Sequence, residues 1–245
     1  MSNFQYAKPA SVEQVTSFLA KGKANVFLMA GGTDLLGEIK EGIIAPDVVV
    51  DLRAIPNLSY IKKEKEAVAV GALTTVAELV DNPIVKQDYP VLHQAAGVVA
   101  SPQLRNMGTL GGNLCQRPRC WYYRDGQVHC TKKGGTKCYA EKGRNKYHAI
   151  LGGGICYAVY PSDLAPALIA LEAKAVIASP QGERTVPLAE FYTPPLVNVR
   201  KENILSGQEV VKEVRIPAAK RIDKRAYMKF TERGAWDFAV VSVAA

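Results

Sequence analysis

Long apolar runs are missing from this 245-residue sequence, although 48% of its residues are hydrophobic. No stretch approaches the ~18 consecutive apolar residues that a membrane-spanning helix needs. The N-terminal residues, MSNFQYAKPAS, contain no basic stretch followed by an apolar one, so no signal peptide is predicted. We therefore expect a cytoplasmic protein with no membrane partner, unless a partner chain carries an export signal.

Several familiar motifs are also absent. The three histidines, His93, His129 and His148, are scattered and give no ligand pair. The sequence has no C-x2-C pair of the zinc-ribbon kind and no G-x-G-x-x-G fingerprint of a Rossmann site. It carries 31 Lys and Arg against 23 Asp and Glu, a net charge of +8. This balance favours acidic partners, such as phosphate groups or an acidic protein surface.

Two glycine turns follow apolar segments. The first is AGGTD, which begins at Ala30, and the second is TLGGN, which begins at Thr109. Free backbone N–H groups at such turns can bind an anion, and glycine lets a phosphate approach closely. Each turn alone is a weak signal, because most Gly-Gly turns only form a tight bend. Together they suggest two loops that converge on a pyrophosphate.

All five cysteines lie between these turns and the PSD motif that ends at Asp163, with the spacing C-x4-C-x9-C-x7-C-x17-C. Four thiolates can bind zinc or an iron–sulfur cluster, and the spacing alone does not choose between them. The simpler interpretation is that these cysteines are free buried thiols. The many lysines and arginines around these cysteines favour a cluster, because positive charge lowers thiol pKa values and offsets the charge of thiolate ligands.

The hydrophobic pattern predicts both helices and strands. Helices are expected to begin at Ser11, Asp34, Thr74 or Thr75, Pro90 and Asp163. Strands are expected at 25–29, 48–52, 60–62, 67–70, 156–159, 174–178, 209–216 and 226–231. The strands after Pro180 alternate as antiparallel strands do, so a domain boundary is predicted there. The last residues, AVVSVAA, form an apolar run, and the last domain is therefore expected to be incomplete.

Four motifs in order resemble one family. AGGTDLL, SPQLRNMGTLGGNL, CQRPRCWYYRD and YPSDLAPALIALEA together resemble the FAD-binding middle subunit of the molybdenum hydroxylases. That family includes xanthine dehydrogenase, aerobic carbon monoxide dehydrogenase, aldehyde oxidoreductase and 4-hydroxybenzoyl-CoA reductase. The resemblance implies an α+β fold with α/β-type FAD-binding lobes at 1–88 and 89–180, the second with a cysteine-rich cluster loop at 114–156. A small, incomplete α+β C-terminal domain would follow at 181–245.

The resemblance also implies which residues hold FAD. The first loop would surround the pyrophosphate with Leu28, Met29, Ala30, Gly31, Gly32, Thr33, Asp34 and Leu35. The second loop would contribute Thr109, Leu110, Gly111, Gly112 and Asn113. Asp163 would bind the adenosine side, Val211 and Lys229 match later FAD-contacting positions, and Phe238 matches a position near the isoalloxazine ring. No catalytic acid or base is expected.

A subset of these subunits carries a [4Fe–4S] cluster in a loop after the second glycine turn. The resemblance to that subset implies the ligands Cys120, Cys130, Cys138 and Cys156 and leaves Cys115 outside the set. It further implies a hetero-oligomer with a small [2Fe–2S] subunit and a large molybdopterin-binding subunit. The chain would pass electrons between iron–sulfur centres and an external acceptor or donor through FAD.

Two other functions compete with this reading. A stand-alone flavin oxidoreductase of the same fold would need its own substrate pocket, and the sequence offers no catalytic constellation for one. A basic zinc-binding module that binds nucleic acid would account for the charge and the cysteines. It leaves both glycine turns and the PSD motif unexplained, so no nucleic-acid partner is expected.

Overall fold

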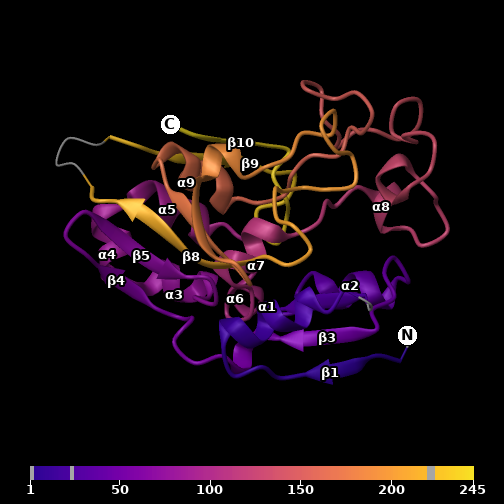
Figure 1. Ribbon diagram of the computed structural model, residues 1–245. Helices are drawn as coiled ribbons and strands as arrows, with labels where there is room; N and C mark the ends of the chain where they lie inside the picture. Colours follow the sequence, from indigo (N-terminus) through magenta and orange to yellow (C-terminus); the bar gives the residue numbers. More distant parts are fainter. Residues whose placement is uncertain (1–2, 23–24, 220–223) are drawn as a thin grey trace.

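The N-terminal part forms a small parallel sheet in the computed structural model, which describes residues 3–22, 25–219 and 224–245 (Figure 1). Its strands lie in the order β1 (Gln5–Ala7), β3 (Val48–Asp51) and β2 (Val26–Met29). The helix α1 (Val12–Ala20) begins where the Ser11 side chain accepts a hydrogen bond from the N–H of Gln14, as the sequence predicts. After β2, the chain enters the first glycine loop, residues 28–35, at the carboxyl end of the strand.

An antiparallel sheet forms the centre of the molecule. Its order is β4 (Ile61–Lys63), β5 (Ala67–Gly71), β8 (Val210–Pro217), β6 (Lys174–Ser179) and β7 (Gly182–Pro187). The strands come from all three expected ranges, 1–88, 89–180 and 181–245, and Pro180 lies in the turn of the β6–β7 hairpin. The division into these three ranges stays a proposal, and all three contribute strands to the same sheet.

Short helices cover the sheet and enclose the largest core cluster. They are α3 (Val76–Asp81), α4 (Pro83–Asp88), α5 (Pro90–Gly97), α6 (Pro102–Arg105), α7 (Leu110–Cys115) and α9 (Leu164–Ala170). Apolar side chains of β5, β6 and β8 pack there against α3, α5, α7 and α9. The described residues contain no helix that is long and apolar enough to cross a bilayer. The α+β class expected from the sequence is confirmed.

The cysteine-rich segment, residues 114–156, extends from one side of this core and lies at the right of Figure 1. It contains little regular structure, with a short helix α8 (Trp121–Arg124) and a 3-10 turn η2 (Thr131–Lys133). Two further 3-10 turns, η1 (Leu52–Ala54) and η3 (Leu188–Glu190), lie elsewhere. The helix α2 (Leu35–Lys40) follows the first glycine loop and contacts the cysteine-rich segment through its carboxylates.

Three local predictions need correction. Residues 156–159 form no strand, because this stretch lies against the cysteine-rich segment, where Ala149 N–H donates to the Tyr157 carbonyl at 2.8 Å. The helix from Pro90 ends at Gly97 instead of continuing to residue 100. The helix α4 is not among the expected helices; Asn82-Pro83, a pair that commonly ends a helix, here starts one, with Asn82 as its cap and Pro83 at its first position.

The C-terminal hairpin, β9 (Tyr227–Phe230) and β10 (Val241–Ala244), is held to α9 by a buried ion pair. Lys229 Nζ lies 2.8 Å from Asp163 Oδ2, and the two side chains are only 5% and 7% exposed. The Tyr227 hydroxyl donates to the other carboxylate oxygen at 2.7 Å. Asp163 lies at the N-cap position of α9 but makes no side-chain cap hydrogen bond. Its carboxylate therefore joins two elements instead of capping one.

Replacing Asp163 by Asn should lower the free energy of unfolding by about 3 kcal/mol, because the Lys229 ammonium would stay buried without its counter-charge. Glu183→Gln is the matched control, since Glu183 pairs with Lys212 at 2.6 Å on the surface, where the side chains are 48% and 35% exposed. That change should cost under ~1 kcal/mol. Urea unfolding measures both, and equal losses would contradict the assignment.

Candidate functional site

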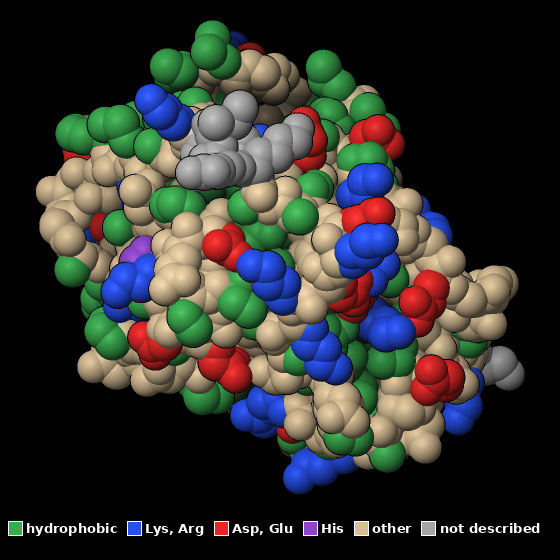
Figure 2. Space-filling model, turned by 90° about the vertical axis from the view of Figure 1, so that its left-hand side faces the viewer, with side chains coloured by type: hydrophobic (Ala, Val, Ile, Leu, Met, Phe, Trp, Pro, Cys, Tyr) green, Lys and Arg blue, Asp and Glu red, His purple; other side chains and the backbone are tan. Residues whose placement is uncertain are grey.

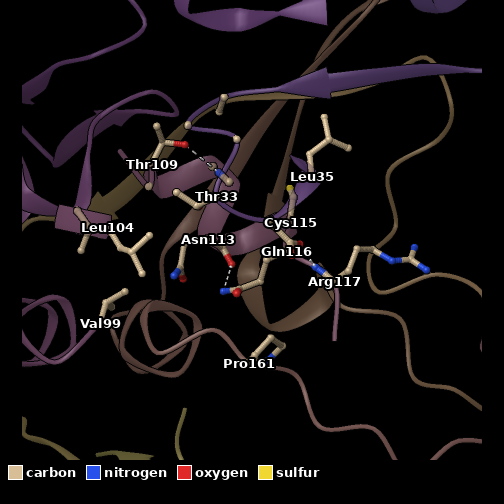
Figure 3. A pocket seen from close by; sticks show the side chains of 18 of the residues that line it. Thr33, Leu35, Val99, Leu104, Thr109, Asn113, Cys115, Gln116, Arg117 and Pro161 are labelled. Carbon is tan, nitrogen blue, oxygen red and sulfur yellow. Dashed lines mark hydrogen bonds between the residues drawn. The ribbon is translucent and has the colours of Figure 1, made fainter. Parts of the chain in front are cut away.

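A cavity of about 790 Å³ lies where the two glycine loops meet (Figure 3). Its walls come from the first loop (28–35), the second loop (109–113), the start of α3, the turn before β8 and the segment 233–238. This volume lies within the range of about 300–1,000 Å³ that is typical of ligand pockets. The convergence of the two loops that the sequence suggests is therefore present.

Both loops lie close against other parts of the protein backbone or side chains, and glycine permits this close approach. A Cβ added to Gly31 would lie 1.8 Å from the carbonyl oxygen of Met107. A Cβ on Gly111 would lie 3.0 Å from the Cβ of Ala72. Gly32 has a φ of 73°, a backbone conformation that residues other than glycine rarely adopt. At Gly31 and Gly111 the close neighbour in this structure is the protein itself, and their role in the approach of a phosphate stays a prediction.

The loops differ in the hydrogen-bonding capacity that they offer. The N–H groups of Gly32, Thr33 and Asp34 donate no hydrogen bond within the described part of the chain. In the second loop, Gly111 N–H donates to Ala72 O at 2.8 Å and Gly112 N–H donates to Thr109 Oγ1 at 3.1 Å (Figure 3). The first loop can therefore bind an acceptor through its backbone, whereas the second faces the cavity mainly with side chains.

Most of the residues expected from the sequence line this cavity. They are Leu28, Ala30, Gly31, Gly32, Thr33, Asp34, Leu35, Thr109, Gly111, Gly112, Asn113, Asp163, Val211 and Phe238. Three of the expected residues do not. Met29 packs on Ile39 and Val49. Leu110 is 1% exposed and belongs to the largest core cluster, and the Lys229 ammonium is paired with Asp163.

Other lining residues carry no sequence signal that would have placed them here. Ala72, Leu73 and Val76 follow β5, and Glu209 and Val210 precede β8 or begin it. Their neighbours in the cavity lie far away in sequence, so only the assembled sheet brings them together. Leu104 is different, because it belongs to the SPQLRNMGTLGGN motif and points toward the cavity from the side of Val99 (Figure 3).

Charged groups at the cavity are paired with one another. Arg119 Nη1 lies 2.9 Å from Asp34 Oδ1, and Arg233 pairs with Asp237 at 3.5 Å. The guanidinium of Arg119 also lies under the ring of Phe238, 5.1 Å from its centroid. Burial lowers the pKa of Arg119, and the charge of Asp34 opposes that effect. The wall is therefore close to neutral, and an anionic ligand would depend on backbone donors.

Cys120 lies close enough to Cys130 and Cys156 for their charges to act on it, and Cys156 lies similarly close to Cys130 and Cys138. Burial raises the pKa of Cys120, and the charges of Cys156 and Cys130 raise it further. Burial likewise raises the pKa of Cys156, with smaller contributions from Cys138 and Cys130. All the cysteines are free thiols. Within the described residues, however, no group of three or more His, Cys, Asp or Glu side chains is arranged to hold a metal ion.

Cys115 belongs to different surroundings. It lies at the end of α7 and lines the cavity between the glycine loops, and burial raises its pKa to about 12. The sequence expectation that its thiol packs inward fits this position.

Aromatic side chains gather around Cys120. His148 Nε2 lies 3.1 Å from Cys120 Sγ, and the His148 ring lies 5.4 Å from that of Trp121. Burial lowers the pKa of His148. The interpretation of His148 as a structural residue is compatible with this packing, and Trp121 and Tyr122 pack against the same histidine.

Comparison with known proteins identifies the family. A family model described as the FAD binding domain in molybdopterin dehydrogenase matches residues 2–219. The aldehyde oxidoreductase FAD-binding subunit PaoB of Escherichia coli is 36% identical over 220 residues, covering 89% of this chain and 69% of the relative. The carbon monoxide dehydrogenase medium chain of Hydrogenophaga pseudoflava is 30% identical over 242 residues, covering 98% and 68%.

A solved structure of carbon monoxide dehydrogenase from Hydrogenophaga pseudoflava has the same fold. It superimposes with a TM-score of 0.71 at 28% identity and covers 97% of this chain and 66% of that chain. This chain thus spans about two thirds of the length of these relatives. Since the family model matches most of its length, the chain belongs to the FAD-binding domains of the molybdopterin dehydrogenases, which are components of oxidoreductases.

Proposed function

We propose that this chain is the FAD-carrying electron-transfer component of a multi-subunit molybdenum hydroxylase. The observation that carries the proposal is the cavity of about 790 Å³ between two glycine loops. One of these loops presents backbone N–H groups that have no partner among the residues the structure describes. FAD supplies the electron exchange between one-electron centres and an acceptor or donor, and the chain binds and orients it. Substrate chemistry would take place at molybdenum on a large subunit, with a small [2Fe–2S] subunit between them.

The first loop is the proposed binding site for the pyrophosphate. Gly32, Thr33 and Asp34 offer three consecutive N–H groups, and Thr33 adds a hydroxyl at the cavity wall. Such a concave run of donors suits phosphate oxygens, and hydrogen bonds to a charged acceptor are stronger than those to a neutral one. The nearly neutral wall makes these donors the main source of phosphate affinity.

The remaining roles extend along the cavity. Asn113 accepts a hydrogen bond from Ser162 Oγ at 2.5 Å through Oδ1, which leaves its amide nitrogen for a ligand. Asp163 stays the proposed contact for the adenosine side, and Lys229 is reassigned from a direct contact to the partner that fixes the Asp163 carboxylate. Val211 contributes an apolar surface to the same wall.

A [4Fe–4S] cluster at Cys120, Cys130, Cys138 and Cys156 is the second part of the proposal. The mutual electrostatic influence of these four thiols supports it, as does the position of Cys115 away from them in the flavin cavity. Lys132 adds positive charge beside Cys156, which would offset the charge of thiolate ligands. Metal binding and ordering of this segment should be coupled, because the donors are not already in a closed ligand geometry.

The nucleic-acid alternative is weakened by how the basic residues are used. In the cysteine-rich segment, Arg117 and Lys132 both pair with Glu202, at 2.7 and 2.6 Å. On the face shown in Figure 2, Lys and Arg side chains are interspersed with Asp and Glu. Lys63 and Asp88 form one ion pair at the surface, at 2.8 Å. Phosphate backbones favour unpaired basic stripes, so we assign no nucleic-acid partner.

Thr33→Val should weaken FAD binding about tenfold, because it removes one hydroxyl donor to a charged acceptor while keeping the side-chain shape. Titration of flavin-free protein with FAD, followed by flavin fluorescence, measures the dissociation constant. Thr185→Val on the exposed strand β7 is the matched control and should bind as wild type does. Equal affinity in both variants would refute the first loop as the phosphate site.

Anaerobically purified wild-type protein should contain iron and acid-labile sulfide, and Cys156→Ser should lose both, because that thiol is a proposed ligand. Cys115→Ser is the matched control and should keep them. Zinc without sulfide in the wild type would refute the cluster. Loss of iron from Cys115→Ser with retention in Cys156→Ser would instead refute the choice of ligands.

A further inference from the structure

Asp34 turns its side chain away from the helix that it precedes. It lies at the N-cap position of α2 but makes no side-chain cap hydrogen bond there. Both carboxylate oxygens instead accept hydrogen bonds from the cysteine-rich segment. Oδ2 accepts from the backbone N–H of Arg117 at 2.7 Å, and Oδ1 accepts from Arg124 Nη2 at 2.7 Å. Arg119 Nη1 lies 2.9 Å from the same Oδ1. The first glycine loop is therefore fixed by residues about 85 positions away in sequence.

Arg124 is held so that its guanidinium can make this contact. Its Nε donates to Pro118 O at 2.8 Å, and Nη2 also donates to Arg117 O at 3.0 Å. The side chains of Arg124 and Asp34 are each 17% exposed, so solvent screens the pair only weakly. Arg124 thus binds both the backbone at residues 117–118 and the first glycine loop.

A second contact one turn further along α2 repeats the arrangement. The Tyr123 hydroxyl donates to Glu38 Oε1 at 2.6 Å and accepts from Arg117 Nε at 2.9 Å. Burial raises the pKa of Glu38, and the Tyr123 hydrogen bond opposes that effect. Adjacent residues of α8 therefore bind two carboxylates of α2, at Asp34 and at Glu38.

We propose that Arg124 is a positioning residue for FAD binding that acts through Asp34. Its guanidinium holds the Asp34 carboxylate, and this hold sets the direction of the N–H groups of Gly32, Thr33 and Asp34 toward the cavity. Arg124 itself does not line the cavity, so its influence on the cofactor is indirect. The inference rests on the proposed binding of FAD, and it adds a dependence of that binding on helix α8.

The test is a double-mutant cycle on FAD affinity with Asp34→Asn and Arg124→Gln. Each single variant should bind FAD about tenfold more weakly than wild type, within the range typical of coupled sites. The double variant should bind no more weakly than Asp34→Asn alone, because that change already removes the contact with Arg124. Arg124→Lys should recover part of the loss, since it keeps the charge and loses the planar fork.

Two further variants separate positioning from simple loss of structure. Arg144→Gln changes an exposed arginine of the same segment and should bind FAD as wild type does. Tyr123→Phe removes only the hydroxyl at Glu38 and should weaken binding in the same direction by a smaller factor. Far-ultraviolet circular dichroism of every variant verifies folding, so an affinity change in folded protein reports the loop.

The possible outcomes distinguish the role of Arg124 from the proposed binding of FAD on which it rests. Wild-type protein that binds no FAD would overturn both. Wild-type binding with an unchanged dissociation constant for Arg124→Gln, or strictly additive losses in the cycle, would overturn the inference alone.

Discussion

The contact between the Asp34 carboxylate and the arginines of residues 117–124 determines how the cavity is built. It replaces the helix cap that Asp34 would otherwise make, so the first glycine loop is shaped by tertiary contacts instead of by its own helix. Removing a charged partner from such a shielded pair costs more than removing one from the surface. The flavin loop and the cysteine-rich segment are therefore parts of one structural unit, despite their different proposed cofactors.

The same principle of paired charge explains a contrast in the molecule. The sequence carries a net charge of +8, which suggests a basic surface waiting for an acidic partner. Within the described residues, the arginines nearest the cavity are instead engaged by Asp34, Glu38 and Glu202. The positive charge beside the cavity thus serves internal connections, and the phosphate recognition that we propose would depend on uncharged backbone groups of the first loop.

Local signals in the sequence predicted local structure well. The Ser11 cap and the strands β4 and β5 were expected, because each depends on neighbouring residues. The convergence of the two glycine loops was suggested by the likeness of two motifs that lie far apart in the sequence. Residues 156–159 were mistaken for a strand, since their apolar pattern cannot reveal that no sheet edge lies beside them. The contact of Gly31 with Met107 could not be predicted either, because a glycine in the sequence indicates that something can lie close to the backbone but not which residue does.

The position of β8 has a consequence for synthesis of the chain. This strand lies between β5 and β6 and pairs with both, yet it is the last of the five to leave the ribosome. Before β8 is made, β5 and β6 each present an unpaired edge. Their side chains are mostly apolar and buried in the folded protein, and such exposed edges are prone to aggregate. Val210 and Val211, which complete one wall of the cavity, arrive with the same strand. Because the segment 233–238 also lines the cavity, a nascent chain shorter than about 238 residues has no finished cavity, and loading of the flavin must follow closure of the sheet.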